Sequence, residues 1–201
     1  MARPREFDEA RVLDAAVQCF WSRGYEATSV RDLVDGTGIT SASLYNAFGD
    51  KRALYQRALD HYVEKSIADR IRRCAAMAPR EAIDAFFAEI LRRSLDDPQH
   101  KGCMLVNATL DVAPHDPDFQ AIVAEVLVRI EIFFHDRVSA GQAEGSITSS
   151  VTAEHLAHHL LGVLMGLRVL ARVRPERALL EGIVASVRVL LHRSDAESMR
   201  R

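Results

Sequence analysis

The fold is decided by residues 29–48, which read SVRDLVDGTGITSASLYNAF. Ser29 and Asp32 have the spacing of a capping box, so a short helix begins there and ends at the glycines that follow. Thr40 can cap a second short helix that runs to the end of the stretch. Two short helices joined by a glycine-containing turn are the layout of a helix-turn-helix, whose second helix enters the major groove of DNA.

The rest of the chain is also helical in pattern, and no alternating strand pattern interrupts it. Before the motif, Asp8 can cap a helix that stops at Gly24, a good C-terminal residue. After it, Asp50 can cap a long helix that reaches past Ile71. Five more helices are expected over residues 79–96, 103–113, 119–140, 152–174 and 175–192. The sequence therefore predicts an all-α chain of nine helices.

Composition limits the function classes. The 201 residues carry 26 Lys or Arg against 28 Asp or Glu, a formal charge of −2, so DNA binding must rest on a local patch and not on overall charge. The longest uncharged apolar stretch, 155–167, contains three histidines and is too short to span a bilayer. The N-terminus leads into charged residues and not into an apolar signal core. We expect a cytoplasmic protein with no membrane partner.

The second helix of the motif is suited to reading bases. Its outward positions carry short polar side chains that allow close approach to base edges, and Asn46 can read adenine with two hydrogen bonds. A helix start, basic side chains and a phenol lie around it and suit phosphate. The candidate DNA-binding residues are Arg3, Arg5, Thr28, Ser29, Arg31, Thr40, Ser41, Ala42, Ser43, Tyr45, Asn46 and Lys51.

With these residues in place, the chain resembles the TetR family of transcriptional regulators. The matching positions are residues 12–16, Phe20, residues 24–25, residues 28–33, residues 38–40, residues 44–45, Phe48 and residues 51–54. The resemblance implies an all-helical homodimer with a helix-turn-helix DNA-binding domain at 1–52 and a ligand-binding and dimerisation domain at 53–201. It also implies that a small-molecule effector releases the protein from a double-stranded DNA operator, which is expected to be a near-palindrome.

The chain departs from the family pattern on its reading face. Ser41 stands where Lys is frequent, Asn46 where His or Tyr is common, and Ala47 where an aromatic residue is usual. Residues 1–54 hold seven Lys or Arg and eight acidic residues, which predicts a shallow salt dependence of DNA binding. The modest charge also leaves open a helical interaction module that has lost specific DNA binding. An activator on the same fold is a further alternative to a repressor.

Cys103 is a candidate sensor of electrophiles or oxidants. In some regulators that this chain resembles, a cysteine at this position has that role. A helix start can lower a thiol pKa, and His100 and Lys101 are near in sequence. The alternative is a buried, inert thiol. The other two cysteines, Cys19 and Cys74, are interpreted as packing residues, since three scattered cysteines make neither a disulfide scaffold nor a four-cysteine zinc site.

A ligand pocket between helices is expected to be apolar. Its candidate walls are Phe86, Phe87, Cys103, Met104, Phe133, Phe134, His158, Leu161 and Met165, each of which can equally be plain core. His155, His158 and His159 share one helix face at a spacing that can hold a metal, but they lie outside any metal-protease motif. We expect no metal and no cofactor. The sequence also lacks nucleotide-binding and hydrolase motifs, which argues against an enzyme.

The last two helices are candidates for the dimer interface, because the family pairs them with their counterparts. Gly162 and Gly166, four residues apart, permit close helix approach. The candidate interface residues are Ala157, Leu160, Leu164, Leu167, Leu179, Ile183, Val187 and Leu190, and packing within one chain is the alternative for each.

Overall fold

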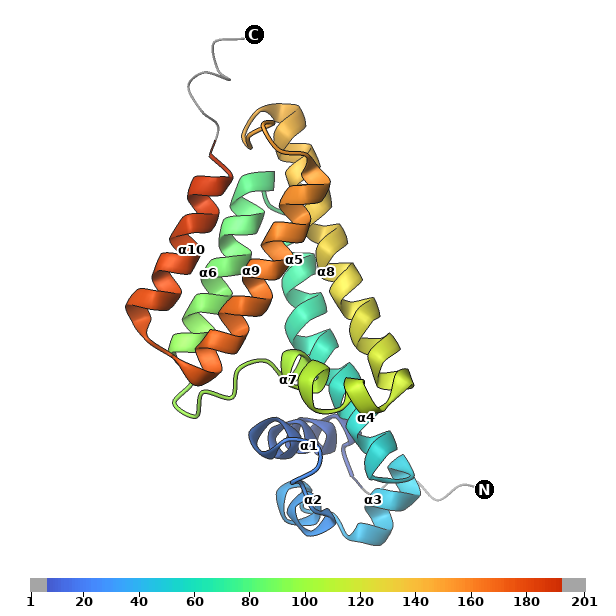
Figure 1. Ribbon diagram of the computed structural model, residues 1–201. Helices are drawn as coiled ribbons and strands as arrows, with labels where there is room; N and C mark the ends of the chain where they lie inside the picture. Colours follow the sequence, from blue (N-terminus) through green and yellow to red (C-terminus); the bar gives the residue numbers. More distant parts are fainter. Residues whose placement is uncertain (1–6, 193–201) are drawn as a thin grey trace. The chain divides into compact units, whose positions relative to one another are not determined.

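The computed structural model describes residues 7–192, and within that range all regular structure is helical, with no β-strand (Figure 1). The first four helices are α1 (Glu9–Arg23), α2 (Val30–Thr37), α3 (Ser41–Phe48) and α4 (Lys51–Tyr62). Each begins at the cap that the sequence predicts, because the side chains of Asp8, Ser29, Thr40 and Asp50 accept hydrogen bonds from backbone N–H groups of the first turn. The predicted helix starts are confirmed here.

The predicted long helix after Asp50 is continuous but not uniform. A six-residue π-helical segment, Val63–Ala68, joins α4 to α5 (Asp69–Ala75). Such segments are rare, and the apolar pattern of the sequence does not signal it. The remaining elements are α6 (Pro79–Leu95), α7 (Met104–Asp111), a 3-10 turn at Ala113–His115, α8 (Pro117–Glu144), α9 (Ala153–Val173) and α10 (Arg177–Leu190). With α4 to α5 counted as one run, the described residues hold nine α-helices, as predicted.

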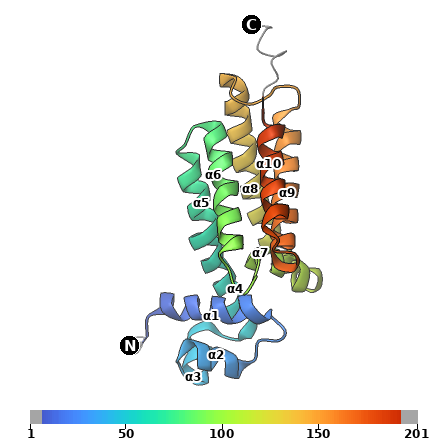
Figure 2. The ribbon, with the colours of Figure 1, turned by 90° about the vertical axis from the view of Figure 1, so that its left-hand side faces the viewer.

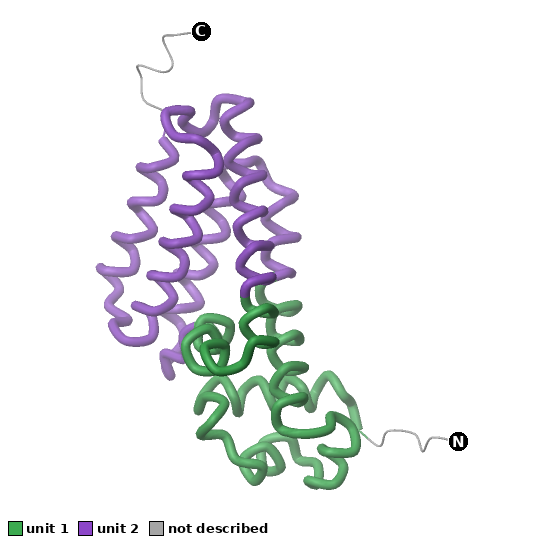
Figure 3. The backbone as a smooth tube through the Cα atoms, turned by 45° about the vertical axis from the view of Figure 1, so that its right-hand side comes forward, with its two compact units in different colours: residues 1–67, 103–123 green, residues 68–102, 124–201 purple. Residues whose placement is uncertain are grey.

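The chain divides into two compact units (Figure 3). Unit 1 comprises residues 1–67 and 103–123, and unit 2 comprises residues 68–102 and 124–201. Unit 1 therefore contains the helix-turn-helix together with α7 and the first turns of α8, which lie far from the motif in sequence. The helix-turn-helix therefore packs in one compact unit with residues 103–123.

The core of unit 1 lies between the N-terminal helices. Phe20 of α1, Leu33 of α2, Leu44 of α3 and Leu54 of α4 are almost completely buried. Tyr55 packs edge-on against Phe20, with ring centroids 4.9 Å apart. One apolar side chain from each helix thus meets the others, and burial of this set holds the motif as a rigid block.

Unit 2 is a bundle in which α6, α9 and α10 lie side by side (Figure 2). Its core includes Leu160 and Leu167 of α9 and Leu180 of α10, all fully buried. By length and composition alone, α9 could cross a membrane. Four of its leucines, Leu156, Leu160, Leu164 and Leu167, are however buried within the chain, as in a core helix of the same composition.

Candidate nucleic-acid interface

The reading head is built from α2, a three-residue turn and α3. Ser29 accepts a hydrogen bond from the Asp32 N–H (3.1 Å), and Asp32 accepts in return from the Ser29 N–H (2.8 Å), which completes the capping box. Gly38 ends α2 with φ of 73°, a left-handed conformation that suits glycine and redirects the chain into α3. Local sequence therefore fixes the angle at which α3 leaves the turn.

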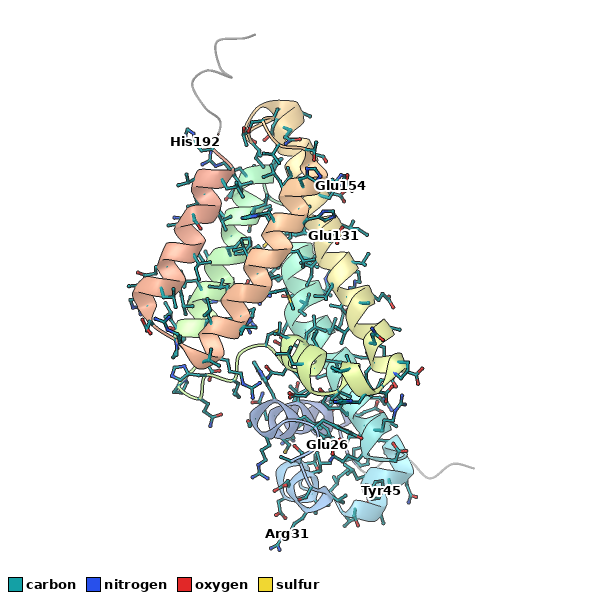
Figure 4. The ribbon with its side chains drawn as sticks, viewed as in Figure 1. Glu26, Arg31, Tyr45, Glu131, Glu154 and His192 are labelled. Atoms are coloured by element: carbon teal, nitrogen blue, oxygen red, sulfur yellow. The ribbon has the colours of Figure 1, made fainter. Side chains whose placement is uncertain are left out.

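The outer face of α3 is polar and open. Ser41, Ala42 and Asn46 are exposed, and Tyr45 keeps 37% of its surface accessible (Figure 4). Leu44 and Phe48 occupy the opposite face and are buried. The structure thus places these four predicted DNA-binding residues together on one accessible surface.

Thr40 and Ser43 are less available than the sequence predicts. The Thr40 hydroxyl accepts from the Ser43 N–H (3.2 Å) and donates to the Ser43 hydroxyl oxygen (3.0 Å). Both groups therefore stabilise the first turn of α3. Each hydroxyl oxygen keeps acceptor capacity, so a role at the DNA surface remains compatible with the cap.

Thr28, which the sequence predicts as a DNA-binding residue at a helix start, is not accessible to DNA. Thr28 is fully buried, and its hydroxyl donates to the Gly24 carbonyl oxygen at 2.6 Å. The side chain thus closes the α1–α2 turn from inside. A threonine beside a helix start looks the same in sequence whether it faces solvent or the core, and here the core interaction prevails.

The basic candidates separate into three groups. Arg31 is 91% exposed on α2, with only a 3.8 Å approach to Asp35 (Figure 4). Lys51 folds over the ring of Tyr25, with Nζ 4.5 Å from its centroid, and donates to the Glu26 carbonyl at 3.3 Å. Its ammonium has further donors for phosphate. The predicted contacts at Arg3 and Arg5 lie outside the described residues.

Arg52, which sequence reasoning did not select, is paired with two carboxylates. Its Nε and Nη2 donate to the two carboxylate oxygens of Asp116 at 2.7 and 2.9 Å, and Nη2 also donates to Asp118 at 2.7 Å. The hydrogen bond from Arg52 lowers the pKa of Asp116 below its usual range, and the two carboxylates raise the pKa of Arg52. Its partners are more than 60 residues away, so no local pattern could reveal them.

Four of the candidate pocket residues form an aromatic cluster. Phe86, Phe87, Phe133 and Phe134 belong to unit 2, are all buried, and stack on one another with centroids 5.1 to 6.0 Å apart. These four side chains pack as core of unit 2, which is the alternative that the sequence left open to a pocket wall. Leu161 and Met165 are half-buried on α9.

Three further members of the predicted pocket set are His158, Cys103 and Met104. The prediction of His158 as a pocket wall is wrong: its side chain is exposed on α9, with Nε2 3.2 Å from Oε1 of Glu131 on α8. Cys103 and Met104 are buried in unit 1, where the Tyr62 hydroxyl donates to Cys103 Sγ at 3.5 Å. No group of three or more His, Cys, Asp or Glu side chains in residues 7–192 is placed to hold a metal.

Unit 2 has two surface grooves that the sequence did not predict. One, of about 450 Å³, runs between α6 and α10 over Leu91, Leu95 and Val184. The other, of about 550 Å³, continues along α6 past Asp84. None of the predicted pocket residues lines either groove.

Five of the eight candidate dimer residues are covered within a single chain. Ala157, Leu160, Leu164, Leu167 and Val187 are buried in unit 2, so intrachain packing holds for them and they offer no surface to a partner. Leu179, Ile183 and Leu190 are half-buried. The exposed positions of the same helices include several glycines and valines beside charged and polar residues. These glycines and valines are Gly162, Gly166, Val169 and Val173 on α9 and Gly182 and Val189 on α10.

Comparison with known proteins identifies the architecture. Residues 12–58 match the family described as bacterial regulatory proteins, tetR family, and residues 79–189 match the tetracyclin repressor-like C-terminal domain. The HTH-type transcriptional regulator YezE of Bacillus subtilis is 33% identical over 148 residues, covering 73% of this chain and 76% of YezE. The HTH-type transcriptional repressor ComR of Escherichia coli is 33% identical over 118 residues, 58% of this chain and 56% of ComR.

A solved structure agrees over nearly the whole chain. It is a cysteine-substituted variant of the TetR-family transcriptional regulator CifR in complex with 26-base-pair double-stranded operator DNA. The likeness has a TM-score of 0.80 at 29% identity and covers 94% of this chain and 100% of that chain. Fold and motif define a helix-turn-helix transcriptional regulator. The chain belongs to the TetR family.

Proposed function

We propose that this protein is a homodimeric repressor that binds a near-palindromic DNA operator through α3 and leaves it when a small-molecule effector binds. The observation that carries the proposal is the accessible polar face of α3, held by caps at both ends over a buried apolar face. The name of ComR, a transcriptional repressor, and the operator complex of CifR support the same function.

Each exposed residue of the reading head has a distinct role in this proposal. Ser41 and Asn46 donate and accept at base edges, and Ala42 allows contact with a thymine methyl group. Tyr45, Arg31 and Lys51 contact the phosphate backbone, where they fix the register of the protein on the duplex. Ser29 contributes through the N-terminal end of α2, which favours an anion.

The dimer forms through the exposed surface of α9 and α10. Outside the adjacent backbone of its own helix, an added Cβ at Gly162, Gly166 or Gly182 would meet no atom of residues 7–192 within 4 Å, so these positions leave room for another helix. Val173 and Val189 are 65% and 75% exposed beside them. Burial of this apolar surface against a second copy would place two reading heads on one DNA site.

The division of labour follows the predicted ranges, with DNA binding at 1–52 and ligand binding with dimerisation at 53–201. An electrophilic or oxidising effector would act at Cys103, which reaches solvent only after local opening because the thiol is buried. The protein has no catalytic role in this proposal and works in the cytoplasm, where operator DNA is found.

Selection of random double-stranded DNA by the full-length protein tests the proposal. We expect one enriched motif, a near-palindrome whose half-sites are about 10 base pairs apart or a multiple of that spacing, bound by a dimer. Enrichment of a single asymmetric half-site would contradict the dimeric mode. Enrichment of no motif by folded protein would favour the interaction module.

A further inference from the structure

Arg52 occupies a position that connects the reading head to a distant part of the chain. It is the second residue of α4 and follows the end of α3 by only four residues. Because Asp50 caps α4 through the Ala53 N–H at 2.7 Å, the intervening chain has little freedom. Any contact that fixes Arg52 therefore also restricts α3.

The partners of Arg52 are equally well fixed at the start of α8. Asp116 Oδ1 accepts from the N–H groups of Asp118 and Phe119, at 3.1 and 3.3 Å, and so caps this helix. Phe119 is fully buried, 5.2 Å from both the Arg52 guanidinium carbon and the ring of Tyr55. Arg52 and Tyr55, one turn apart on α4, thus meet Asp116 and Phe119, one turn apart on α8.

The neighbouring cation is engaged differently. Lys51 contacts Tyr25 and the Glu26 carbonyl in the α1–α2 turn, within the helix-turn-helix itself. Arg52 makes three hydrogen bonds to carboxylates of residues 116 and 118. A guanidinium committed to two carboxylates is electrostatically compensated, and its transfer to a phosphate would require breaking a bidentate pair.

The pair is poorly suited to a mainly stabilising role. The Arg52 side chain is 40% exposed, and exposed ion pairs contribute little to the free energy of unfolding. Bidentate geometry instead fixes direction. A fixed direction matters where a reading helix must be presented at one angle.

We propose that Arg52 is a positioning residue that locks the recognition helix to the first turn of α8 and does not contact DNA. This inference rests on the proposed function, since it assigns how the reading head is oriented. Through the Arg52–Asp116–Asp118 cluster, a displacement of the start of α8 would also move α3. The remainder of α8 belongs to unit 2.

The test compares Arg52→Gln, Asp116→Asn and the double variant with Lys51→Gln as the matched control. Asn can still cap α8, so Asp116→Asn removes the pair and keeps the helix start. Affinity for the selected DNA is measured by fluorescence anisotropy between roughly 50 and 200 mM salt. Far-UV circular dichroism and the midpoint of thermal unfolding confirm that each variant is folded.

We expect Arg52→Gln to weaken DNA binding by roughly tenfold without changing the slope of log K against log salt concentration. Asp116→Asn should weaken binding to a similar degree, and the double variant should be no weaker than Arg52→Gln, because all three break one lock. Lys51→Gln should reduce the slope by about 0.9, the value for one lost phosphate contact.

A reduced slope in Arg52→Gln, or additive losses in the double variant, would overturn the proposal, as would an unchanged affinity. Hydrogen exchange of the DNA-free protein gives a readout that does not depend on the operator. Amides of α3 should exchange faster in Arg52→Gln than in wild type, and equal rates would also overturn the lock. If the wild type selects no DNA, the proposed function fails, and the exchange rates alone decide the lock.

Discussion

Replacing Gly166 by Arg should convert the protein from a dimer to a monomer and lower its affinity for operator DNA by about 100-fold or more. Gly166 is exposed on α9, and outside the adjacent backbone of its own helix an added Cβ there meets no atom of residues 7–192 within 4 Å. Arg is also a better helix former than Gly, so the protomer keeps its fold. The charged side chain would instead occupy the surface on which we place the second copy.

Sedimentation equilibrium measures the change, with anisotropy on the selected DNA as the second readout. Ala143→Arg, at an exposed position of α8, is the control and should remain dimeric with unchanged affinity. A Gly166→Arg protein that stays dimeric and binds the operator as tightly as wild type would exclude the α9 surface from the interface. The candidate interface residues Leu179 and Ile183, which are half-buried in one chain, would then have no proposed contact with a second copy.

Phe134→Ala should reduce the free energy of unfolding by about 3–5 kcal/mol, the range for large aromatic truncations in a packed core. Phe134 is completely buried and contacts three other rings, with centroids 5.1 Å away for Phe86, 5.6 Å for Phe87 and 5.5 Å for Phe133. Deleting one ring leaves a cavity that the stacked neighbours can fill only in part.

Urea unfolding at one fixed protein concentration measures this loss, since dimer formation makes stability depend on concentration. Val128→Ala is the control on the same helix. Val128 is 51% exposed, and its truncation should cost less than about 0.5 kcal/mol. A loss below about 1 kcal/mol for Phe134→Ala would mean that the aromatic cluster surrounds a space and is not a close-packed core.

The sequence predicted the helices well because their start signals are local. Asp8, Ser29, Thr40 and Thr152 each accept a hydrogen bond from a backbone N–H two or three residues later, so spacing alone identifies them. Pro175 was a poorer guide: α10 begins at Arg177 with Glu176 as its N-cap. Proline is compatible with a helix start and does not specify one.

Apolar periodicity shows which face of a helix is buried but not what buries it. Leu160, Leu164 and Leu167 were predicted at a dimer interface, and the structure buries them against their own chain. The surface on which we place the second copy includes Gly162 and Gly166, whose spacing in the sequence already indicates close helix approach. The spacing alone does not say whether the approaching helix belongs to the same chain, and the structure leaves both positions exposed.

Long-range polar pairs are the part of the site that sequence cannot supply. Thr28 and Arg52 flank the motif segment, residues 29–48, and both suit phosphate by residue type. The structure turns Thr28 to the Gly24 carbonyl and Arg52 to Asp116. Tyr45 and Asn46 keep the exposure that the sequence predicts, because helical spacing from the buried Leu44 and Phe48 determines it.

The central claim is that the outer face of α3 reads DNA sequence. The most direct test is to measure the dissociation constants of wild type and of the double variant Ser41→Ala, Asn46→Ala on the selected DNA and on a scrambled duplex. Wild type should prefer the selected DNA by about 1,000-fold or more. The variant should lose that preference, with unchanged affinity for the scrambled duplex, because neither substitution removes a charge. A double variant that keeps the wild-type preference would show that α3 does not read the operator.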